Sequence, residues 1–176
     1  MAYDEIIRTS RRKPLVDPES AGVKVAHGVT EVERILPHRP PVRYVDGITR
    51  VDLEHQSLVG YRDIAADDPV FAGHFPDVPL YPGTYQLESI GQMGVCLSWF
   101  LRNERTDVPV DAQPTAVRAL KIHHAQFLRP VPPGVRATMA VKLLEQDDFG
   151  AVVAGQFLLD GKITAFSVGE LYFPND

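Results

Sequence analysis

Residues 71–88 read FAGHFPDVPLYPGTYQLE, and this stretch opens the one long helix that the sequence predicts. A Gly-His-Phe-Pro turn containing His74 is followed by a Pro-Gly pair ending at Gly83, and an apolar run over 83–102 comes next. Glu88 would lie in the second turn of that helix. Chemistry beside a carbonyl group needs a proton acceptor, an oxyanion stabiliser and a proton donor. A histidine, a helix N-terminus and a carboxylate supply all three within this short stretch.

The predicted helix has no clear polar face, so we expect it to be buried on most sides. Its interior holds Gly91, Gly94 and Ser98. Because each glycine weakens a helix by about 1 kcal/mol, these residues predict that another backbone approaches closely. Strand-like runs surround it at 42–52, 57–64, 115–124, 135–145, 149–159 and 162–173. One buried helix and about six mostly antiparallel strands predict an α+β domain, with the sheet wrapped around the helix.

The remainder of the chain divides into an arm and one domain. Residues 1–28 combine basic residues and prolines with little periodicity, so we expect a mobile or draped N-terminal arm. Residues 29–176 are predicted to form a single domain. Thr30 and Glu33 have the spacing of a capping box, which predicts a short helix starting there.

Composition excludes several classes of function. The 176 residues are 44% apolar and 23% charged, an ordinary balance for a globular domain. The net charge of −5 argues against nucleic acid and against an anionic membrane as bulk partners. No apolar run reaches the roughly 18 residues of a membrane span, and no signal peptide is evident. The single cysteine, Cys96, fits a reducing cytoplasm, and no metal-ligand spacing is present.

Five ordered blocks resemble the bacterial 3-hydroxyacyl-acyl-carrier-protein dehydratases of fatty-acid synthesis. The blocks are Leu36-Pro37-His38-Arg39-Pro40, Gly73-His74-Phe75-Pro76, Pro82-Gly83, Glu88 with Gln92, and Phe127-Leu128-Arg129-Pro130-Val131-Pro132-Pro133-Gly134. Together they span about residues 30–173. The resemblance implies the hotdog fold, a long helix wrapped by a curved antiparallel sheet. It also implies loss of water from a 3-hydroxyacyl thioester carried on the phosphopantetheine of an acyl carrier protein, giving the trans-2-enoyl thioester without a cofactor.

The same resemblance implies the roles of three residues. His74 would be the base, the backbone N–H of Gly83 would polarise the thioester carbonyl, and Glu88 would be the acid. In that family the acid comes from the partner subunit's helix, so a homodimer is the smallest expected unit, and a higher oligomer or a heteromer is compatible with it. A glutamate at this position implies dehydration without isomerisation of the double bond.

Physical chemistry makes these roles reasonable. An ordinary histidine titrates at about pH 6.5, which suits a base at neutral pH. A glutamic acid must be protonated to protonate a departing hydroxyl, and we expect burial on the apolar helix to keep Glu88 in that form. Gln92 lies four residues further on the same helix face, where it could orient the Glu88 carboxyl. His38 is expected to brace a turn.

Departures from the family pattern fall beside the helix start. Leu80-Tyr81, Thr84, Tyr85 and Gln86 are bulkier or more polar than the usual residues, and they predict a changed substrate tunnel. The tunnel wall is predicted from Phe75, Tyr81, Pro82, Tyr85 and Gln92. This tunnel and the long arm favour a specialised pathway, such as polyene or polyketide tailoring, over housekeeping fatty-acid synthesis.

A locally basic entrance would attract an acidic acyl carrier protein. The candidates are Arg118, Lys121, Arg129 and Arg136, with Arg102 and Arg105 at the helix end. A mixed solvated surface is an equal alternative for these residues. Two other readings remain for the whole chain: a hotdog thioesterase, and a non-catalytic or half-site subunit that pairs with a different hotdog protein.

Overall fold

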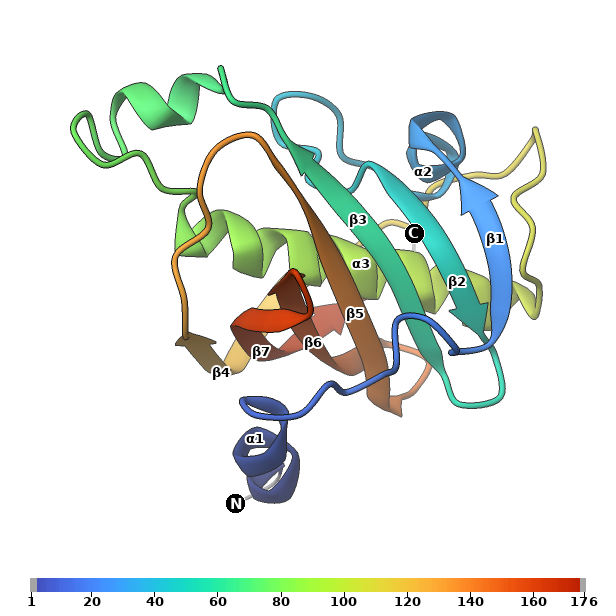
Figure 1. Cartoon of the computed structure of the whole chain (residues 1–176). Coiled ribbons are helices and arrows are strands. Elements are labelled where there is room, and N and C mark those ends of the chain that lie inside the picture. Colours follow the sequence, from blue (N-terminus) through green and yellow to red (C-terminus); the bar gives the residue numbers. More distant parts are fainter. Residues whose placement is uncertain (1–2, 175–176) are drawn as a thin grey trace.

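A seven-stranded antiparallel sheet curves around one long helix, α3 (Gly83–Asn103), in this computed structural model, which describes residues 3–174. Figure 1 shows α3 running behind the strands, along the concave side of the sheet. The predicted α+β class and hotdog arrangement are therefore confirmed. No helix within the described residues is both long and apolar enough to cross a membrane.

The sheet order is β1-β2-β3-β5-β6-β7-β4, and every neighbouring pair is antiparallel. The strands are β1 (Val23–His27), β2 (Gly47–Asp52), β3 (Ser57–Ile64), β4 (Arg118–Phe127), β5 (Val135–Gln146), β6 (Gly150–Leu159) and β7 (Lys162–Tyr172). All six predicted strands are present, and β1 is a seventh, formed by residues that the sequence pattern assigns to the arm. β1 and β4 end the order, so each pairs with only one strand.

The main hydrophobic core lies between α3 and the sheet. Met93, Leu97 and Phe100 of α3 are fully buried there, with Met139 and Phe157 from the strands. A Cβ added at Gly94 would lie 2.8 Å from Cγ2 of Val153, whereas a Cβ at Gly91 would meet nothing within 4 Å. The expectation of a close neighbouring backbone is therefore wrong for the chain by itself: Gly94 makes room for a side chain, and Gly91 faces open space.

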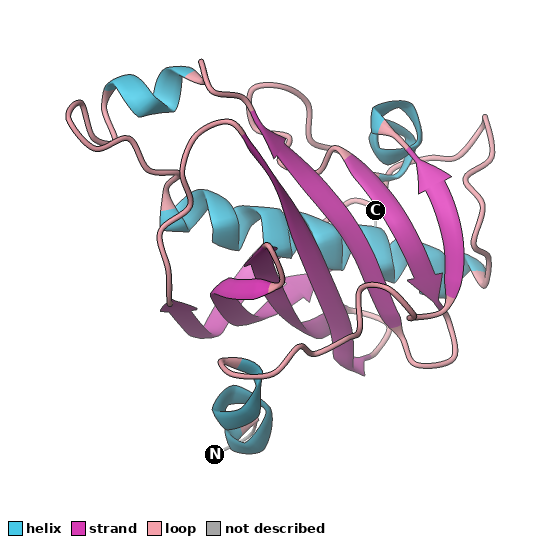
Figure 2. Cartoon of the chain, viewed as in Figure 1, coloured by secondary structure: helices cyan, strands magenta, loops and turns pink. Residues whose placement is uncertain are grey.

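Helix α1 (Asp4–Ser10) and the segment after it lie on the opposite face of the sheet. Val16 packs against Val59 and Ala140. Val59 alternates along its strand with core residues, so it faces away from α3. The amide of Gln156, which is fully buried, donates to the carbonyls of Ser10 and Lys13 and accepts from the N–H of Leu15. Figure 2 shows α1 well apart from α3, joined to β1 by an irregular segment.

The N-cap residue of helix α2 (Val29–Ile35) is Gly28, which lies two residues before the predicted cap, Thr30. The side chain of Glu31 accepts a hydrogen bond from the N–H of Gly28 at 2.9 Å, so Gly28 is the N-cap residue and the predicted Thr30–Glu33 capping box is wrong. Arg39 closes the other end of α2, because its guanidinium donates to the carbonyls of Glu33 and Leu36 at 2.7 and 2.8 Å. Such a cation satisfies carbonyls that the end of a helix leaves unpaired.

Candidate active site

The loop between β3 and α3 holds His74 in a defined orientation. A short 3-10 helix, η1 (Pro69–Ala72), precedes it, and the His74 N–H donates to Val70 O at 2.9 Å. The Leu80 N–H donates to the His74 carbonyl at 2.9 Å, and His74 Nδ1 lies 2.9 Å from the Leu80 carbonyl oxygen. Because a carbonyl only accepts, Nδ1 must carry the proton, and Nε2 of the neutral ring keeps its lone pair. The loop therefore presents Nε2 as a base.

Gly83 begins α3 immediately after this loop, with Pro82 as the N-cap residue. The first backbone N–H groups of a helix have no partner inside the helix, and the helix dipole makes this end favourable for negative charge. A Cβ at Gly83 would lie 2.6 Å from Cε1 of Phe127. A glycine is therefore required for the aromatic ring and the helix start to lie this close.

Glu88 lies in the second turn of α3, where its side chain is 49% exposed in the single chain. Its predicted burial is thus not provided by this chain alone. The Gln92 side-chain amide donates to Glu88 Oε1 at 2.8 Å, as the four-residue spacing predicts. His38 Nε2 lies 3.6 Å from the same oxygen. Among the described residues, no hydrogen bond or ion pair joins His74 to Glu88.

Gln92 also connects the helix to the segment between α2 and β2. It is 1% exposed, its Oε1 accepts from the Tyr44 N–H, and its Nε2 donates to the Val42 carbonyl, both at 2.8 Å. These bonds take up backbone groups of Val42 and Tyr44 that a strand would use; β2 starts at Gly47, and the prediction of a strand from residue 42 is wrong. Gln92 was predicted as tunnel wall, and its three bonds show that it also fixes Glu88 and this segment.

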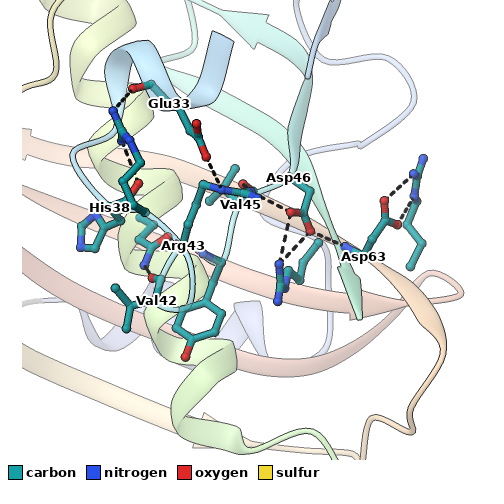
Figure 3. Close-up of polar contacts among 12 residues, drawn as sticks. Glu33, His38, Val42, Arg43, Val45, Asp46 and Asp63 are labelled. Atoms are coloured by element: carbon teal, nitrogen blue, oxygen red, sulfur yellow. Dashed lines mark hydrogen bonds and ion pairs between the residues drawn. The ribbon is translucent and has the colours of Figure 1, made fainter. Parts of the chain in front are cut away.

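A chain of ion pairs continues from the same segment, as Figure 3 shows. Arg43 contacts Glu33 at 3.1 Å and Asp46 at 2.7 Å, and Asp46 in turn contacts Arg62 at 3.0 Å. The Asp63 N–H also donates to Asp46 at 2.8 Å. These two arginines and two carboxylates are largely buried beside α3. Their charges balance one another, as buried charges require.

Two of the predicted tunnel residues, Tyr81 and Tyr85, belong to an aromatic cluster at the start of α3. Tyr81 is 2% exposed, and its ring lies 5.8 Å from the ring of Tyr85 and 6.1 Å from that of Phe157. Tyr85 also lies 4.9 Å from the ring of Tyr44. Burial raises the pKa of the Tyr81 hydroxyl, and the nearby charge of Arg62 opposes this rise. Tyr81 and Tyr85 are therefore neighbours, and their role as tunnel wall stays a prediction.

Two other residues expected at the tunnel lie outside this aromatic cluster. Phe75 is 52% exposed, and its ring stacks on His74 at 4.1 Å. Gln86, expected from its polarity to shape the tunnel, is instead buried in the core, where its Oε1 accepts from the Thr164 hydroxyl at 2.9 Å. The polarity of Gln86 is thus explained by the sheet contact.

The predicted carrier-binding cations have different individual contacts, and a shared basic entrance stays a prediction. Arg118 and Lys121 are exposed on β4. Arg129 donates to the Ile163 carbonyl at 2.8 Å, and Arg136 pairs with Asp63 on an exposed part of the surface. Of the two cations at the helix end, Arg102 stacks on the Phe173 ring at 4.0 Å and Arg105 pairs with Asp107 at 2.6 Å.

Sequence reasoning assigned His38 to bracing a turn and did not consider Arg62. The contact of His38 with Glu88 and that of Arg62 with Asp46 join different segments of the chain. No local spacing could therefore reveal them. The signal that the sequence offered for His38 was its place in the Leu36-Pro37-His38-Arg39-Pro40 block. Within residues 3–174, no three His, Cys, Asp or Glu side chains are grouped so as to hold a metal ion.

Comparison with known proteins agrees with this geometry. The model of the FabA-like domain family matches residues 36–166. The 3-hydroxyacyl-[acyl-carrier-protein] dehydratase FabZ of Campylobacter lari is 36% identical over 138 residues, which cover 78% of this chain and 90% of that protein. The corresponding protein of Aliarcobacter butzleri is 34% identical over 137 residues, with the same coverage of both chains.

A solved structure supports the fold independently. One chain of the dehydratase heterocomplex ApeI:P from Xenorhabdus doucetiae aligns with a TM-score of 0.63 and 17% identity, over 82% of this chain and 91% of that one. The family match leaves out residues 1–35, which contain α1, β1 and α2. From the motif order, the wrapped helix and the extent of these matches, the chain belongs to the FabA-like family.

Proposed function

We propose that this protein is a hydro-lyase that removes water from 3-hydroxyacyl thioesters on an acyl carrier protein, giving the trans-2-enoyl thioester. The observation that carries the proposal is the hydrogen bond between His74 Nδ1 and the Leu80 carbonyl, which leaves Nε2 free beside the start of α3. The relatives named above, which are dehydratases of this type and about a third identical, support the same reaction.

The reaction begins with removal of a proton from C2 of the acyl group by His74 Nε2. Negative charge then builds on the thioester oxygen, and the Gly83 N–H at the positive end of α3 stabilises it. Removal of one such donor costs about 3 kcal/mol in enzymes where it has been tested. Glu88 completes the reaction by giving its proton to the departing hydroxyl, so that water leaves and the double bond forms between C2 and C3.

The active site requires two subunits in this proposal. His74 and Glu88 make no contact within the described part of one chain, and Glu88 is half exposed. Strand β4 ends the sheet and exposes Leu120, Ile122 and Phe127 by 62%, 62% and 53%. An exposed apolar edge strand is a ready site for pairing with another chain. Since Phe127 also lies against Gly83, a homodimer formed along β4 would bring the partner beside the helix start.

The substrate reaches this site on a carrier. An acidic carrier would be attracted to exposed cations, and Arg118, Lys121 and Arg129 are exposed, whereas Arg136 is already paired with Asp63. The aromatic cluster of Tyr81 and Tyr85 supports a tunnel that accepts an acyl chain beside α3. A specialised pathway and a cytoplasmic location remain predictions from the sequence.

A thioesterase and a non-catalytic subunit are less well supported. The relatives that cover most of this chain are dehydratases, and the chain carries both His74 and Glu88, which a subunit without activity would not need. A heteromer remains the second candidate. The structural neighbour ApeI:P is a dehydratase heterocomplex, and the half-exposed Glu88 would fit an unlike partner equally well.

The test is mass spectrometry of 3-hydroxyacyl-carrier substrates incubated with wild type, His74→Ala and Glu88→Gln. We expect loss of one water from the acyl group with wild type only. The two inactive variants are then mixed after brief dissociation. If each site takes His74 from one subunit and Glu88 from the other, random pairing restores about a quarter of the wild-type activity.

The outcomes separate the alternatives. No recovery on mixing would place both residues in a site of one subunit. A free acid in place of the enoyl thioester would establish a thioesterase. No conversion by a folded wild-type dimer, together with activity after an unlike hotdog chain is added, would establish the heteromer.

A further inference from the structure

His38 lies beside the carboxyl group that the proposed reaction uses as its acid. Its Nε2 is 3.6 Å from Glu88 Oε1, the same oxygen that accepts the hydrogen bond from Gln92 at 2.8 Å. At 3.6 Å the histidine makes an electrostatic contact, not a full hydrogen bond. Catalytic hydrogen bonds are often long before substrate binds and shorten in the complex.

The segment that carries His38 is held at several points. Arg39 donates to the carbonyl of His38 at 2.9 Å and to the last carbonyls of α2, and Gln92 binds the backbone of Val42 and Tyr44. Figure 3 shows His38 on this segment, in front of α3 and near Val42. The imidazole is therefore fixed relative to the helix turn that carries Glu88.

The ring environment selects one tautomer. His38 Nδ1 is buried and has no hydrogen-bond partner among the described residues. Nδ1 lacks a partner in either tautomer, so the carboxyl oxygen beside Nε2 decides between them: an N–H at Nε2 faces an acceptor, and the proton of the neutral ring belongs there. The Nε2–H then points its positive end toward Glu88 Oε1, and the imidazole acts as a second donor beside the Gln92 amide.

We propose that His38 is a positioning residue for the acid: with Gln92 it occupies Glu88 Oε1 and thereby leaves the acidic proton on Oε2. An oxygen with two donors aimed at its lone pairs is a poor place for a proton, because the proton would compete with both donors. Oε2 is then the oxygen that faces the departing hydroxyl. This proposal rests on the proposed dehydration and adds to it a residue outside the reacting groups.

Kinetics of the full-length assembled protein test the role. His38→Leu removes the donor, and we expect kcat for a 3-hydroxybutyryl carrier thioester to fall roughly tenfold or more, with KM within about twofold. His38→Gln restores an N–H donor and should recover most of kcat.

The matched control is His55→Leu. His55 also contacts a carboxylate, Asp52 at 3.0 Å, but on the turn between β2 and β3, and we expect wild-type kcat. An unchanged kcat in His38→Leu would overturn the proposal. So would a His38→Gln variant as slow as His38→Leu and with a lowered unfolding midpoint, which would indicate a structural role.

A second readout does not depend on activity. In ¹⁵N spectra of the imidazole rings, wild type should show His38 with its proton on Nε2, and the His38 signals should move in Glu88→Gln. A proton on Nδ1, or signals that ignore Glu88→Gln, would overturn the proposal. If wild type converts no substrate, the proposed dehydration fails, whereas these spectra still decide whether His38 and Glu88 are coupled.

Discussion

Two glycines of α3 differ in the space beside them, and this difference predicts opposite effects of the same substitution. Alanine stabilises a helix interior by about 1 kcal/mol relative to glycine. At Gly91 a new Cβ meets nothing within 4 Å, so Gly91→Ala should keep that gain. At Gly94 the Cβ would lie 2.8 Å from Cγ2 of Val153 and 3.3 Å from Cδ1 of Leu171.

The contact at Gly94 is too short for carbon atoms and must be relieved by movement of buried side chains. Val153 and Leu171 are 2% and 6% exposed, so they have little free room, and overpacking of this kind costs about 1–3 kcal/mol. After the helix gain is subtracted, Gly94→Ala should lower the free energy of unfolding by roughly 0–2 kcal/mol. The two variants should therefore differ by roughly 1–3 kcal/mol.

Urea unfolding at one fixed protein concentration measures this difference, because the stability of an oligomer depends on concentration. Thermal midpoints should differ in the same direction, by about 2–4 °C for each kcal/mol in a chain of this size. Size-exclusion chromatography of both variants controls for changes in assembly. Equal unfolding midpoints, or a Gly94→Ala variant more stable than Gly91→Ala at unchanged mass, would refute the argument from space beside the helix.

Three further outcomes follow from buried or edge groups. Gln156→Leu removes three hydrogen bonds that hold the N-terminal segment, so urea stability should fall by roughly 2–4 kcal/mol and trypsin should cleave after Arg11 or Arg12 sooner. Unchanged cleavage would contradict this. Ile122→Lys places a charge on the exposed edge of β4 and should convert the proposed dimer to a monomer, as measured by light scattering. Phe149→Lys changes an exposed apolar residue on the turn between β5 and β6 and should leave the molecular mass unchanged. Burial raises the pKa of the Cys96 thiol to about 12, so at pH 8 a thiol reagent should label it only as fast as the protein opens; rapid labelling of the folded protein would show that the thiol is accessible.

Regular alternation made most of the sheet predictable from the sequence. The strands after residue 114 and β3 agree with their predicted positions to within about three residues, because each combines period-two apolar patterning with glycine or aspartate turns. β1 was missed for the opposite reason. It is a short edge strand whose residues are exposed or half buried, so Lys24 and His27 interrupt any apolar pattern, and only pairing with β2 makes it a strand.

Non-local hydrogen bonds explain the remaining differences. Val42, Tyr44 and Val45 have the composition of a strand, yet the amide of Gln92, about fifty residues further along the chain, takes up the backbone groups that a strand would use. Local spacing predicted the bond from Gln92 to Glu88, because both residues lie on one helix face. No local pattern indicates that the same amide would also bind another segment.

This double use of Gln92 links the folding of the 36–46 segment to the chemistry. Both hydrogens of the amide are used, one by the Val42 carbonyl and one by Glu88, and its oxygen accepts from Tyr44. The amide therefore cannot rotate to another partner without breaking a contact on the segment. Because His38 lies on that segment and faces the same carboxyl oxygen, loosening the segment would remove His38 from Glu88 and free the Gln92 amide to rotate. The geometry of the acid thus depends on a contact between distant parts of the chain, while the base is held by its own loop through Leu80.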